Sequence, residues 1–422
     1  MPNKLPLNWC ECKFEDVLDY EQPTKYIVEN TDYQDHGTAV LTAGKSFILG
    51  YTNEKEGIFD ASKEPVIIFD DFTTASKIVK FPFKVKSSAM KILHPKTNIN
   101  IDYIYYLMQT IHYENDTHKR YWISEYAKQF IALPPLREQE RIVEKIEALF
   151  ADIDEGMENL KTAQAQIKQY RQSVLKSAFE GKLYKTTEWK EVDITKIIAK
   201  EKNALKAGPF GSALKKEIYV EKGYKIYGQE QVIAQDPFYG DYYIDKNKYE
   251  QLISCKIKPH DILISLVGTI GKVLILPNNI EEGIINPRLL KVTLDFDQYL
   301  PEFFKFYFES QYLRSLFKMK AHGATMDVLN LSILKELPFP LPTLPEQKRI
   351  VEEIEKRFAV ADKLEKAVNE GLEKADKLKQ SILKKAFEGK LVAQNPNDEP
   401  ASILLARIKK ENQSHPKGKK KC

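Results

Sequence analysis

Two short stretches of this chain carry residue types that could bind a phosphate or a methyl donor. Residues 268–272 read GTIGK, which combines glycine with lysine as a phosphate-binding loop does, but the stretch is two residues short and lies between apolar runs. Residues 236–239 read DPFY; they lack the second proline of the DPPY loop of adenine methyltransferases, and no glycine-rich cofactor turn follows an upstream strand. The NPRL stretch at 286–289 fails in the same way. We therefore interpret these stretches as structural turns rather than as active sites.

The histidines and cysteines do not form a pattern typical of a metal site or a catalytic triad. His112 and His118 are six positions apart with Asp116 between them, which is not a standard ligand spacing. Cys10 and Cys12 lack the second ligand pair that a zinc site needs. No Gly-x-Ser-x-Gly motif marks a nucleophilic serine. The sequence thus predicts a chain that is not an enzyme and that uses no cofactor or metal.

The composition is that of a globular protein rather than a disordered or membrane-spanning one. Of the 422 residues, 43% are apolar and 29% are charged. No apolar run approaches the ~18 residues that a membrane span needs, and the N-terminus has no apolar core of signal-peptide length. The four scattered cysteines are too few for a disulfide framework. We expect a cytoplasmic protein.

The charge is modest for a protein that binds nucleic acid by itself. The net charge is only +4; residues 1–132 contain 15 basic and 18 acidic side chains, and residues 184–340 contain 22 and 20. A stand-alone DNA-binding domain usually has a more basic surface. Composition alone does not predict DNA binding, so any DNA contact must depend on specific clusters of residues and on help from a partner.

The chain contains a long internal repeat, which indicates a duplicated element. The phrase LPPLREQERIVEKIEALF begins at Leu133, and LPTLPEQKRIVEEIEKRF begins at Leu341. The copies end on similar words, QSVLKSAFEGKL at Leu183 and QSILKKAFEGKL at Leu391. Each copy follows a proline-rich stretch and ends where glycine can cap a helix. Each therefore predicts one helix of about 43 residues, or roughly 65 Å at ~1.5 Å per residue.

Apolar residues recur every seven positions in both copies, the pattern of helices that pack along their length. Because so long a helix is not stable alone, we expect its partner to be the other copy, antiparallel to it. The predicted seam consists of Ile146, Ile153, Leu160, Ile167, Val174, Ile354, Leu364, Val368, Leu378 and Ile382. The interior glycines Gly156 and Gly371 each cost about 1 kcal/mol relative to alanine. They mark either a close helix approach or a kink.

A third apolar line runs beside this seam. It consists of Val143, Phe150, Met157, Val351, Phe358 and Leu372. Three apolar positions per heptad are more typical of a helical bundle than of a two-stranded coiled coil. We therefore predict that this stripe is a docking surface for helices of other chains. The alternative is that it packs on the globular segments of the protein itself.

The sequence divides into two globular heads and two repeated helices. The predicted domains are a first head at 1–132, a central helix at 133–183, a second head at 184–340, a distal helix at 341–391, and a short helix with a basic tail at 392–422. The heads share little sequence, but both mix strand-like alternation, such as KIVKF at 77–81, with glycine and proline turns. The predicted fold class is α+β, with two globular domains joined by two long antiparallel helices in a pseudo-twofold repeat.

This order of elements resembles the specificity subunit of type I restriction–modification enzymes, and the resemblance covers essentially the whole chain. Its most specific elements are the two helix openings at Leu133 and Leu341. In the second head, KAGPFGSALK (206–215), HDILISLVGTIGKV (260–273), NPRLL (286–290) and HGATMDVLNLSILKELPFPLP (322–342) look like the head of that family. The first head looks like a different class of such head through residues 66–93 and 118–136. It lacks the GPFGS phrase, so positions cannot be transferred safely from one head to the other.

The resemblance implies a function for each part of the chain. In that family the heads are target-recognition domains, the repeated helices are spacers, and the subunit carries no catalysis. Two dissimilar heads would read two different halves of an asymmetric bipartite site in double-stranded DNA, and helix length would set the unread spacer between them. The implied partners are two adenine-N6 methyltransferase subunits, docked on the helices, and ATP-dependent restriction subunits.

Long polar and basic side chains in the heads are the candidates for base contacts, because arginine suits guanine and glutamine suits adenine. The first-head candidates are Lys45, Thr73, Thr74, Lys77, His118, Lys119, Arg120 and Tyr121. The second-head candidates are Lys206, Phe210, Ser212, Lys215, Lys216, Gln229, Lys272, Arg288 and Thr325. The alternative for each of them is a solvated surface residue or a turn former.

The main alternative function is a non-catalytic coiled-coil adaptor with two protein-binding heads. An adaptor explains the heptads and the modest charge, but it does not explain why both heads carry phrases of the same family. A nuclease or methyltransferase that acts alone is disfavoured because the motifs for either chemistry are missing from the sequence.

Overall fold

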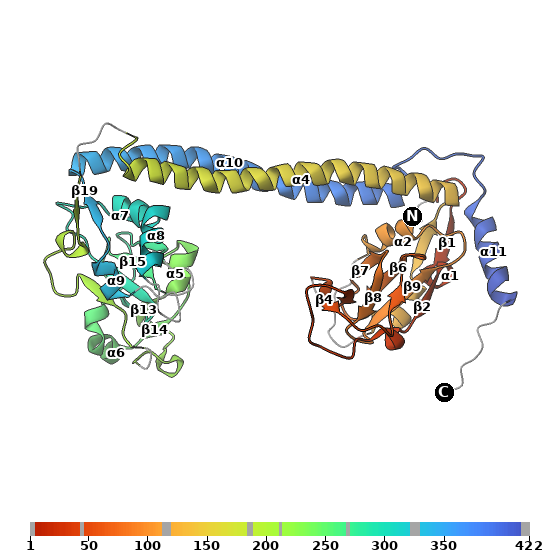
Figure 1. The fold of residues 1–422 in the computed structure, drawn as a ribbon, viewed down its shortest axis with the longest axis horizontal. Helices are drawn as coiled ribbons and strands as arrows, with labels where there is room; N and C mark the ends of the chain where they lie inside the picture. Colours follow the sequence, from red (N-terminus) through yellow and green to blue (C-terminus); the bar gives the residue numbers. More distant parts are fainter. Residues whose placement is uncertain are drawn as a thin grey trace. The chain divides into compact units, whose positions relative to one another are not determined.

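The structure is a computed structural model that describes residues 5–42, 46–111, 120–183, 189–210, 213–266, 271–320 and 330–414. The chain divides into two compact units, one made of Met1–Leu160 with Glu370–Cys422 and the other of Lys161–Asn369. Each unit contains one head and part of each long helix (Figure 1). The unit boundaries therefore fall inside the long helices rather than at the ends of the heads.

The first head contains two four-stranded sheets. One is antiparallel, in the order β2 (Leu18–Glu21), β9 (Met90–Pro95), β6 (Val66–Asp70) and β7 (Ser76–Val79). The other has the order β4 (Ile48–Thr52), β3 (Thr38–Leu41), β8 (Pro82–Val85) and β5 (Phe59–Asp60), with β3 and β8 parallel. The remaining elements are β1 (Cys10–Lys13), its partner β10 (Phe130–Leu133), α1 (Phe14–Val17), η1 (Pro23–Tyr26), α2 (Ile101–Met108), α3 (Tyr121–Ser124) and η2 (Tyr126–Lys128).

The central strand β6 explains how the core of this head is layered. Val66 and Ile68 pack in one cluster with Phe83 of the second sheet. Ile67 and Phe69 pack in another, with α2 and the long helices. Successive side chains of a strand point to opposite faces, and a strand covered on both faces has to be apolar throughout. This is why VIIF at 66–69 shows no polar alternation.

The second head repeats this topology with a different sequence. Its antiparallel sheet has the order β12 (Leu205–Ala207), β18 (Leu289–Val292), β15 (Ile262–Ser265) and β16 (Val273–Ile275). Its second sheet has the order β14 (Tyr243–Ile244), β13 (Tyr224–Tyr227) and β17 (Gly283–Ile285), with β13 and β17 parallel. Strand order and direction match β2-β9-β6-β7 and β4-β3-β8 of the first head. Strand order therefore allows positions in one head to be matched to positions in the other, which their dissimilar sequences did not.

Side chains of β15 are shared between two clusters in the same way as those of β6. Ile262 and Ile264 pack with α7 (Pro301–Phe308), and Leu263 packs toward the second sheet. The other elements are β11 (Lys190–Val192), its partner β19 (Phe339–Leu341), η3 (Ile194–Lys196), η5 (Lys216–Ile218), α5 (Gln229–Ala234), α6 (Lys246–Gln251), η6 (Ile253–Cys255), α8 (Gln311–Lys320) and α9 (Leu331–Lys335).

The two long helices, α4 (Leu136–Phe179) and α10 (Leu344–Phe387), begin and end in the same way. Near the start of each, a fully buried glutamine binds the preceding loop: Gln139 Nε2 donates to Pro134 O at 2.9 Å, and Gln347 Nε2 donates to Pro342 O at 3.0 Å. At the far ends, Gly181 and Gly389 have φ angles of 70° and 69°, as helix-capping glycines do. The repeated motifs EQ and FEGKL therefore determine where each helix begins and ends.

Within each unit the two helices run antiparallel (Figure 1). In the first unit, Lys379 Nζ of α10 lies 2.5 Å from Asp154 Oδ1 of α4. In the second, Arg171 Nη2 of α4 lies 2.5 Å from Asp362 Oδ1 and 3.0 Å from Glu365 Oε2 of α10. The prediction of two α+β heads with a pair of long antiparallel helices is confirmed.

Most of the predicted seam residues are covered, but two are not. Ile146, Val174, Ile354, Val368 and Ile382 are buried, and Ile153, Leu160 and Ile167 are half-buried. Leu364 and Leu378 are 53% and 51% exposed, so their assignment to the seam is wrong. In α10 the residues that follow the predicted positions by one, among them Phe358 and Ala386, face inward instead. This line of residues also carries charged residues, but they pair with α4: Glu365 with Arg171, and Lys379 with Asp154.

Four of the six residues of the predicted docking stripe pack on the heads of the protein itself, which is the alternative that the sequence left open. Val143 and Val351 are each 7% exposed and belong to the head cores. Phe150 lies against Tyr106, with the ring centroids 5.8 Å apart. Phe358 contacts Phe306 in the same way, and Met157 and Leu372 are half-buried. The heads cover these four residues because each head is attached beside a helix end, whereas Met157 and Leu372 lie farther along the helices.

The two interior glycines have different surroundings, and their alanine variants should differ accordingly. A Cβ added at Gly156 would meet nothing within 4 Å, whereas one at Gly371 would lie 3.0 Å from Leu160 Cδ1. Gly371 thus marks a close helix approach. We expect Gly156→Ala to raise the free energy of unfolding by about 1 kcal/mol, the difference in helix propensity. Gly371→Ala should gain little or nothing, because Leu160 has to move. Paired urea titrations of the two variants check this, and an equal gain would contradict it.

The segment after α10 returns to the first head. Helix α11 (Ala401–Ser414) packs Leu404 and Ile408 into the core of that unit. Arg141 Nη2 of α4 lies 2.6 Å from Asp398 Oδ2, which is nearly buried, just before α11. Within the described ranges, none of the helices has the length and apolar character needed to cross a membrane.

Candidate nucleic-acid interface

In the second head, loops from four strands meet at one end of the antiparallel sheet. This end holds the last residues of β12 and β15 and the first residues of β16 and β18. Gly208 N donates to Leu289 O at 2.9 Å, Leu266 N to Arg288 O at 3.0 Å, and Gly271 N to Ser265 O at 3.3 Å. The described residues of three stretches that are far apart in the sequence, at 208–210, 271–272 and 286–290, therefore share one edge. We call it the head 2 edge.

The second sheet ends at the same edge. Asn286 N, after β17, donates to Tyr227 O at the end of β13, at 2.8 Å. Gln229 Nε2 donates to Ser265 Oγ at 2.7 Å and so ties α5 to β15. A Cβ added at Gly208 would lie 1.8 Å from Asn286 O, so only glycine permits the two loops to approach this closely. The edge is held by backbone and buried polar contacts.

Several predicted base-reading residues lie on this edge. Phe210 is 91% exposed, Arg288 is exposed, and Lys206 and Lys272 are half-buried. Gln229 is only 9% exposed and is bonded to Ser265, so the prediction that it reads adenine is not supported; it positions the edge instead. Lys215 and Lys216 are exposed at η5, which is not one of the connections that form the edge. Ser212 and Thr325 lie outside the described residues.

One carboxyl group lies directly behind the head 2 edge. Glu309 Oε1 accepts a hydrogen bond from Val273 N at 3.3 Å, next to Lys272. Burial raises the pKa of Glu309, and Lys305 is the largest opposing influence.

The first head forms an edge at the equivalent strand ends. Asp71 N, after β6, donates to Ala89 O before β9 at 3.0 Å, and Tyr121 N donates to Asp71 O at 2.9 Å. In the second sheet, Lys86 N, after β8, donates to Leu41 O at the end of β3 at 2.9 Å. We call this the head 1 edge. Its loops are residues 42–47, 71–75, 86–89 and the start of α3, of which 43–45 lie outside the described residues.

A buried ion pair fastens the head 1 edge to its sheet. Asp71 Oδ2 lies 2.9 Å from Lys91 Nζ, with the two side chains 1% and 0% exposed. Asp71 Oδ1 also accepts a hydrogen bond from Trp122 N at 2.8 Å. One carboxylate thus holds the turn after β6, the start of α3 and strand β9 together.

The predicted first-head residues are divided between this edge and the core. Thr73 and Thr74 form the β6–β7 turn, where Thr74 has a φ of 59°. Lys77 Nζ lies 4.9 Å from the centre of the Phe47 ring and is exposed. Arg120 is exposed, whereas Tyr121 is 3% exposed and packs in the core, so it offers no base-reading surface. Lys45, His118 and Lys119 lie outside the described residues.

Sequence reasoning missed three exposed residues of the head 1 edge. Lys86, Ser87 and Ser88 connect β8 to β9, at the position that the Asn286–Arg288 loop occupies in the second head. A polar run between two apolar strands was the only signal in the sequence. Their importance becomes visible only when β8 and β9 are matched to β17 and β18.

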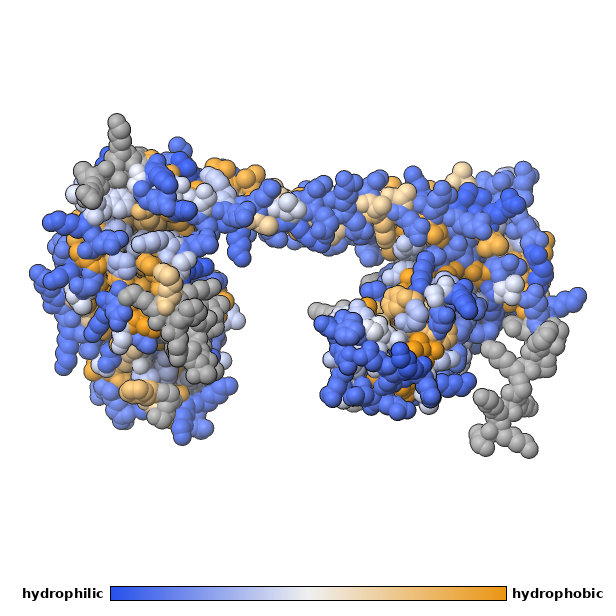
Figure 2. All heavy atoms as spheres, in the orientation of Figure 1, coloured by the Kyte–Doolittle hydropathy of each residue, from blue (hydrophilic) through white to orange (hydrophobic). Residues whose placement is uncertain are grey.

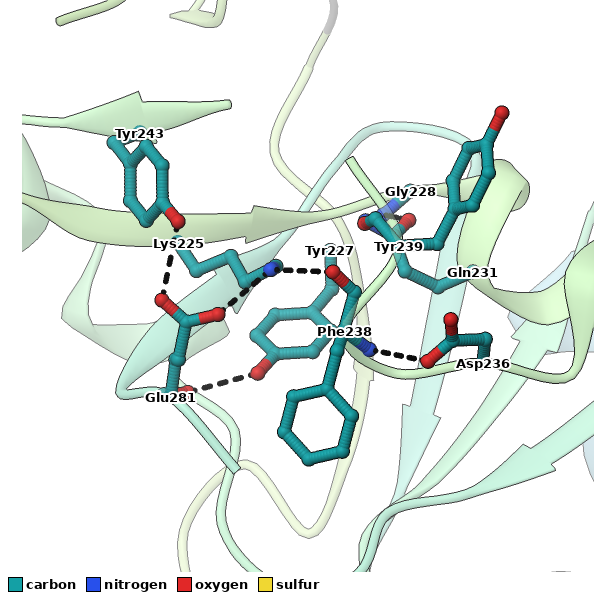
Figure 3. A network of polar contacts seen from close by, with 9 residues as sticks. All are labelled: Lys225, Tyr227, Gly228, Gln231, Asp236, Phe238, Tyr239, Tyr243 and Glu281. Atoms are coloured by element: carbon teal, nitrogen blue, oxygen red, sulfur yellow. Dashed lines mark hydrogen bonds and ion pairs between the residues drawn. The ribbon is translucent and has the colours of Figure 1, made fainter. Parts of the chain in front are cut away.

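Elsewhere in the second head, a polar network anchors the loop after α5 (Figure 3). The Lys225 side chain is 1% exposed; its Nζ lies 2.7 Å from Glu281 Oε1 and donates to Phe238 O at 3.1 Å. Tyr227 Oη donates to Glu281 O at 2.9 Å. The DPFY stretch is therefore a structural turn, in keeping with its missing second proline.

The structure offers no obvious metal site in the part of the chain that it describes. No group of three or more His, Cys, Asp or Glu residues there could hold a metal ion. Cys10, Cys12 and Cys255 are free thiols. Burial raises the pKa of Cys12 to about 12, so this thiol does not ionise at neutral pH.

Comparisons with known proteins point to one family. A family model described as type I restriction modification DNA specificity domain matches residues 188–374. The EcoDI specificity subunit of Escherichia coli is 30% identical over 329 residues, which cover 67% of this chain and 68% of that protein. The chain belongs to the family of type I restriction enzyme specificity subunits.

Other members of the family match parts of the chain. The EcoR124I/EcoR124II specificity subunit of Escherichia coli is 44% identical over 190 residues, or 42% of this chain and 45% of that protein. The EcoBI specificity subunit of Escherichia coli matches over 64% of its length. The chain thus spans about half to two thirds of these relatives. A chain from a solved type I R-M system matches 92% of this chain and 100% of its own length, with a TM-score of 0.66 and 19% identity; this likeness supports the fold.

Proposed function

We propose that this specificity subunit reads an asymmetric bipartite DNA site, one half with each edge, and that it has no catalytic activity of its own. The observation that carries the proposal is the equivalence of the two edges. Both heads gather polar and basic residues that are exposed or half-buried at the same strand ends, yet the residues differ: Thr73 and Lys77 in one, Lys206 and Arg288 in the other. Base contacts give sequence preference, so different edges select different half-sites.

We also propose that the long helices dock two adenine-N6 methyltransferase subunits, to which ATP-dependent restriction subunits are added. Val143 and Val351 of the predicted stripe are buried in the head cores and cannot contribute to this contact. Exposed apolar residues elsewhere on the helices are the better candidates: Tyr170, Val360 and Leu364 in the second unit, and Leu378 in the first, are 43–54% exposed. The visible faces of the helices in Figure 2 are otherwise mostly hydrophilic.

Genome-wide mapping of N6-methyladenine tests this function. Cells that express the cognate methyltransferase, with and without this chain, should differ by one bipartite motif that appears only with the chain. Methylation that is the same in both cultures, with both proteins expressed, would contradict the proposal and favour the coiled-coil adaptor.

Substitutions on the two edges should alter different halves of that motif. Arg288→Ala should cost about 1–3 kcal/mol at one base of the second half-site, or roughly 5–150-fold in discrimination, and leave the first half unchanged. Lys77→Ala should do the reverse. Arg407→Ala, which changes an exposed arginine on α11 that belongs to neither edge, is the control. The same mapping reads out all three variants, and a change in the half-site of the unaltered head would refute the assignment.

A further inference from the structure

The second head contains a segment that the first head lacks. The connection between β13 and β14 spans residues 228–242 and includes α5, whereas the equivalent connection between β3 and β4 is only residues 42–47. The extra chain ends in a loop of residues 235–242, which we call the aromatic loop. Because the first head folds without such a segment, the aromatic loop is not needed for the fold that the two heads share.

The aromatic loop exposes large side chains instead of covering them. Phe238, Tyr239 and Tyr242 are 45%, 54% and 49% exposed, and Ile233 at the end of α5 is 46% exposed. The Tyr242 ring lies 5.6 Å from that of Tyr219. Aromatic side chains gathered on a surface mark contact sites, because their burial supplies much of the free energy of association.

The loop is held in one conformation. Gln231 Nε2 donates to Tyr239 O at 2.6 Å, Lys225 Nζ donates to Phe238 O, and Phe238 N donates to Asp236 Oδ1 at 2.9 Å. These bonds satisfy the backbone of the loop from inside, so the Tyr239 ring points away from the network in Figure 3. A rigid aromatic surface loses little conformational entropy when a partner covers it.

The aromatic loop is also acidic. The loop contains Asp236 and Asp241, Glu230 lies on α5 before it, and there is no lysine or arginine between positions 229 and 244. All three are exposed. Carboxylates repel phosphate groups, so this surface is unsuited to DNA. Aromatic faces and carboxylates together attract guanidinium and ammonium groups. The chemistry therefore favours a protein surface that carries arginine and lysine.

We propose that the aromatic loop binds the basic surface of the methyltransferase subunit that acts on the half-site of this head; this inference rests on the proposed function. A subunit that methylates an adenine in this half-site lies on the DNA beside the head, and its DNA-binding face is basic because it holds phosphates. Helix α5 connects the head 2 edge, at Gln229, to the aromatic loop. The loop thus meets the margin of that basic face, and only one of the two methyltransferase copies makes this contact.

The binding of purified methyltransferase to the full chain, followed by calorimetry, tests the inference. The variant with Phe238→Ala and Tyr239→Ala should weaken one of the two binding steps about tenfold and leave the other unchanged. Asp241→Lys should weaken the same step, and the difference should shrink as salt rises. Phe296→Ala, another aromatic that is 45% exposed, is the matched control and should change neither step.

The affinity of the same variants for DNA shows whether the loop contacts the methyltransferase or the DNA. The inference expects unchanged DNA affinity of the chain alone. Weaker DNA binding with unchanged methyltransferase binding would make the loop a DNA contact and overturn the inference, as would an absence of any change. Equal weakening of both steps would also overturn it, because only one head has the loop. If the unaltered chain bound no methyltransferase, the proposed function itself would fail.

Discussion

Lys91→Met is expected to lower the free energy of unfolding of the first unit by about 3–5 kcal/mol, the cost of leaving one partner of a buried ion pair without compensation. Lys91 and Asp71 are 2.9 Å apart, and neither is more than 1% exposed. Without the ammonium group, Asp71 keeps its bond from Trp122 N, and the bond from Lys91 to Gln22 Oε1 is lost as well. Asp71 organises the head 1 edge, so reading of the first half-site should fail before the head unfolds.

Urea unfolding followed by hydrogen exchange measures this effect separately in the two units, since a chain with two units need not unfold in one step. Lys80→Met is the matched control: Lys80 lies 3.0 Å from Asp102 but is 54% exposed, so its loss should cost less than about 1 kcal/mol. Adding Asp71→Asn to Lys91→Met should recover part of the stability, because the uncompensated charge is removed. A loss equal to that of Lys80→Met would show that the buried pair does not hold the edge.

The ends of the long helices could be predicted from the sequence because their signals are local. Prolines before the first turn and a glycine after the last turn determine where each helix begins and ends, and each signal lies within about one turn of the boundary that it sets. The inward face of α10 could not be predicted in this way. Two lines of residues one position apart compete for the seam, one through Leu364 and the other through Phe358 and Glu365. The choice between them depends on the contacts that α4 and the heads make. That is decided by tertiary packing, which no heptad pattern contains.

The two edges show a second limit of the sequence. Candidates such as Arg288 and Thr73 were found because basic and polar residues in turns are suited to base contacts. Gln229 and Tyr121 have equally suitable side chains, yet the fold buries both. Lys86 was missed because its neighbours on the edge come from strands far away in the sequence. Each edge is formed by loops that come from different parts of the sequence. Which loops lie together depends on the order of the strands in the sheets, and short motifs do not encode that order.

Gln347→Leu is expected to destabilise the second unit by about 3–5 kcal/mol. The side chain is 0% exposed and makes three hydrogen bonds: Oε1 accepts from Leu300 N at 2.8 Å, and Nε2 donates to Gln298 O at 2.8 Å and to Pro342 O. Leucine has a similar size, so packing changes little. The three backbone groups lose their partner, and each buried, unsatisfied group costs about 1–3 kcal/mol, with some recovery where water enters.

The repeat supplies an internal comparison for this prediction. Gln139 of the first unit makes only two such bonds, accepting from Asn100 N at 3.0 Å and donating to Pro134 O. Gln139→Leu should therefore destabilise its own unit by less than Gln347→Leu destabilises the other. Hydrogen exchange at the amides of Leu300 and Asn100 reports each loss where it occurs. If both variants exchanged like the unaltered chain, the glutamine of the EQ motif would not be what joins each head to its helix. The repeat would then need another explanation, such as contact with a partner.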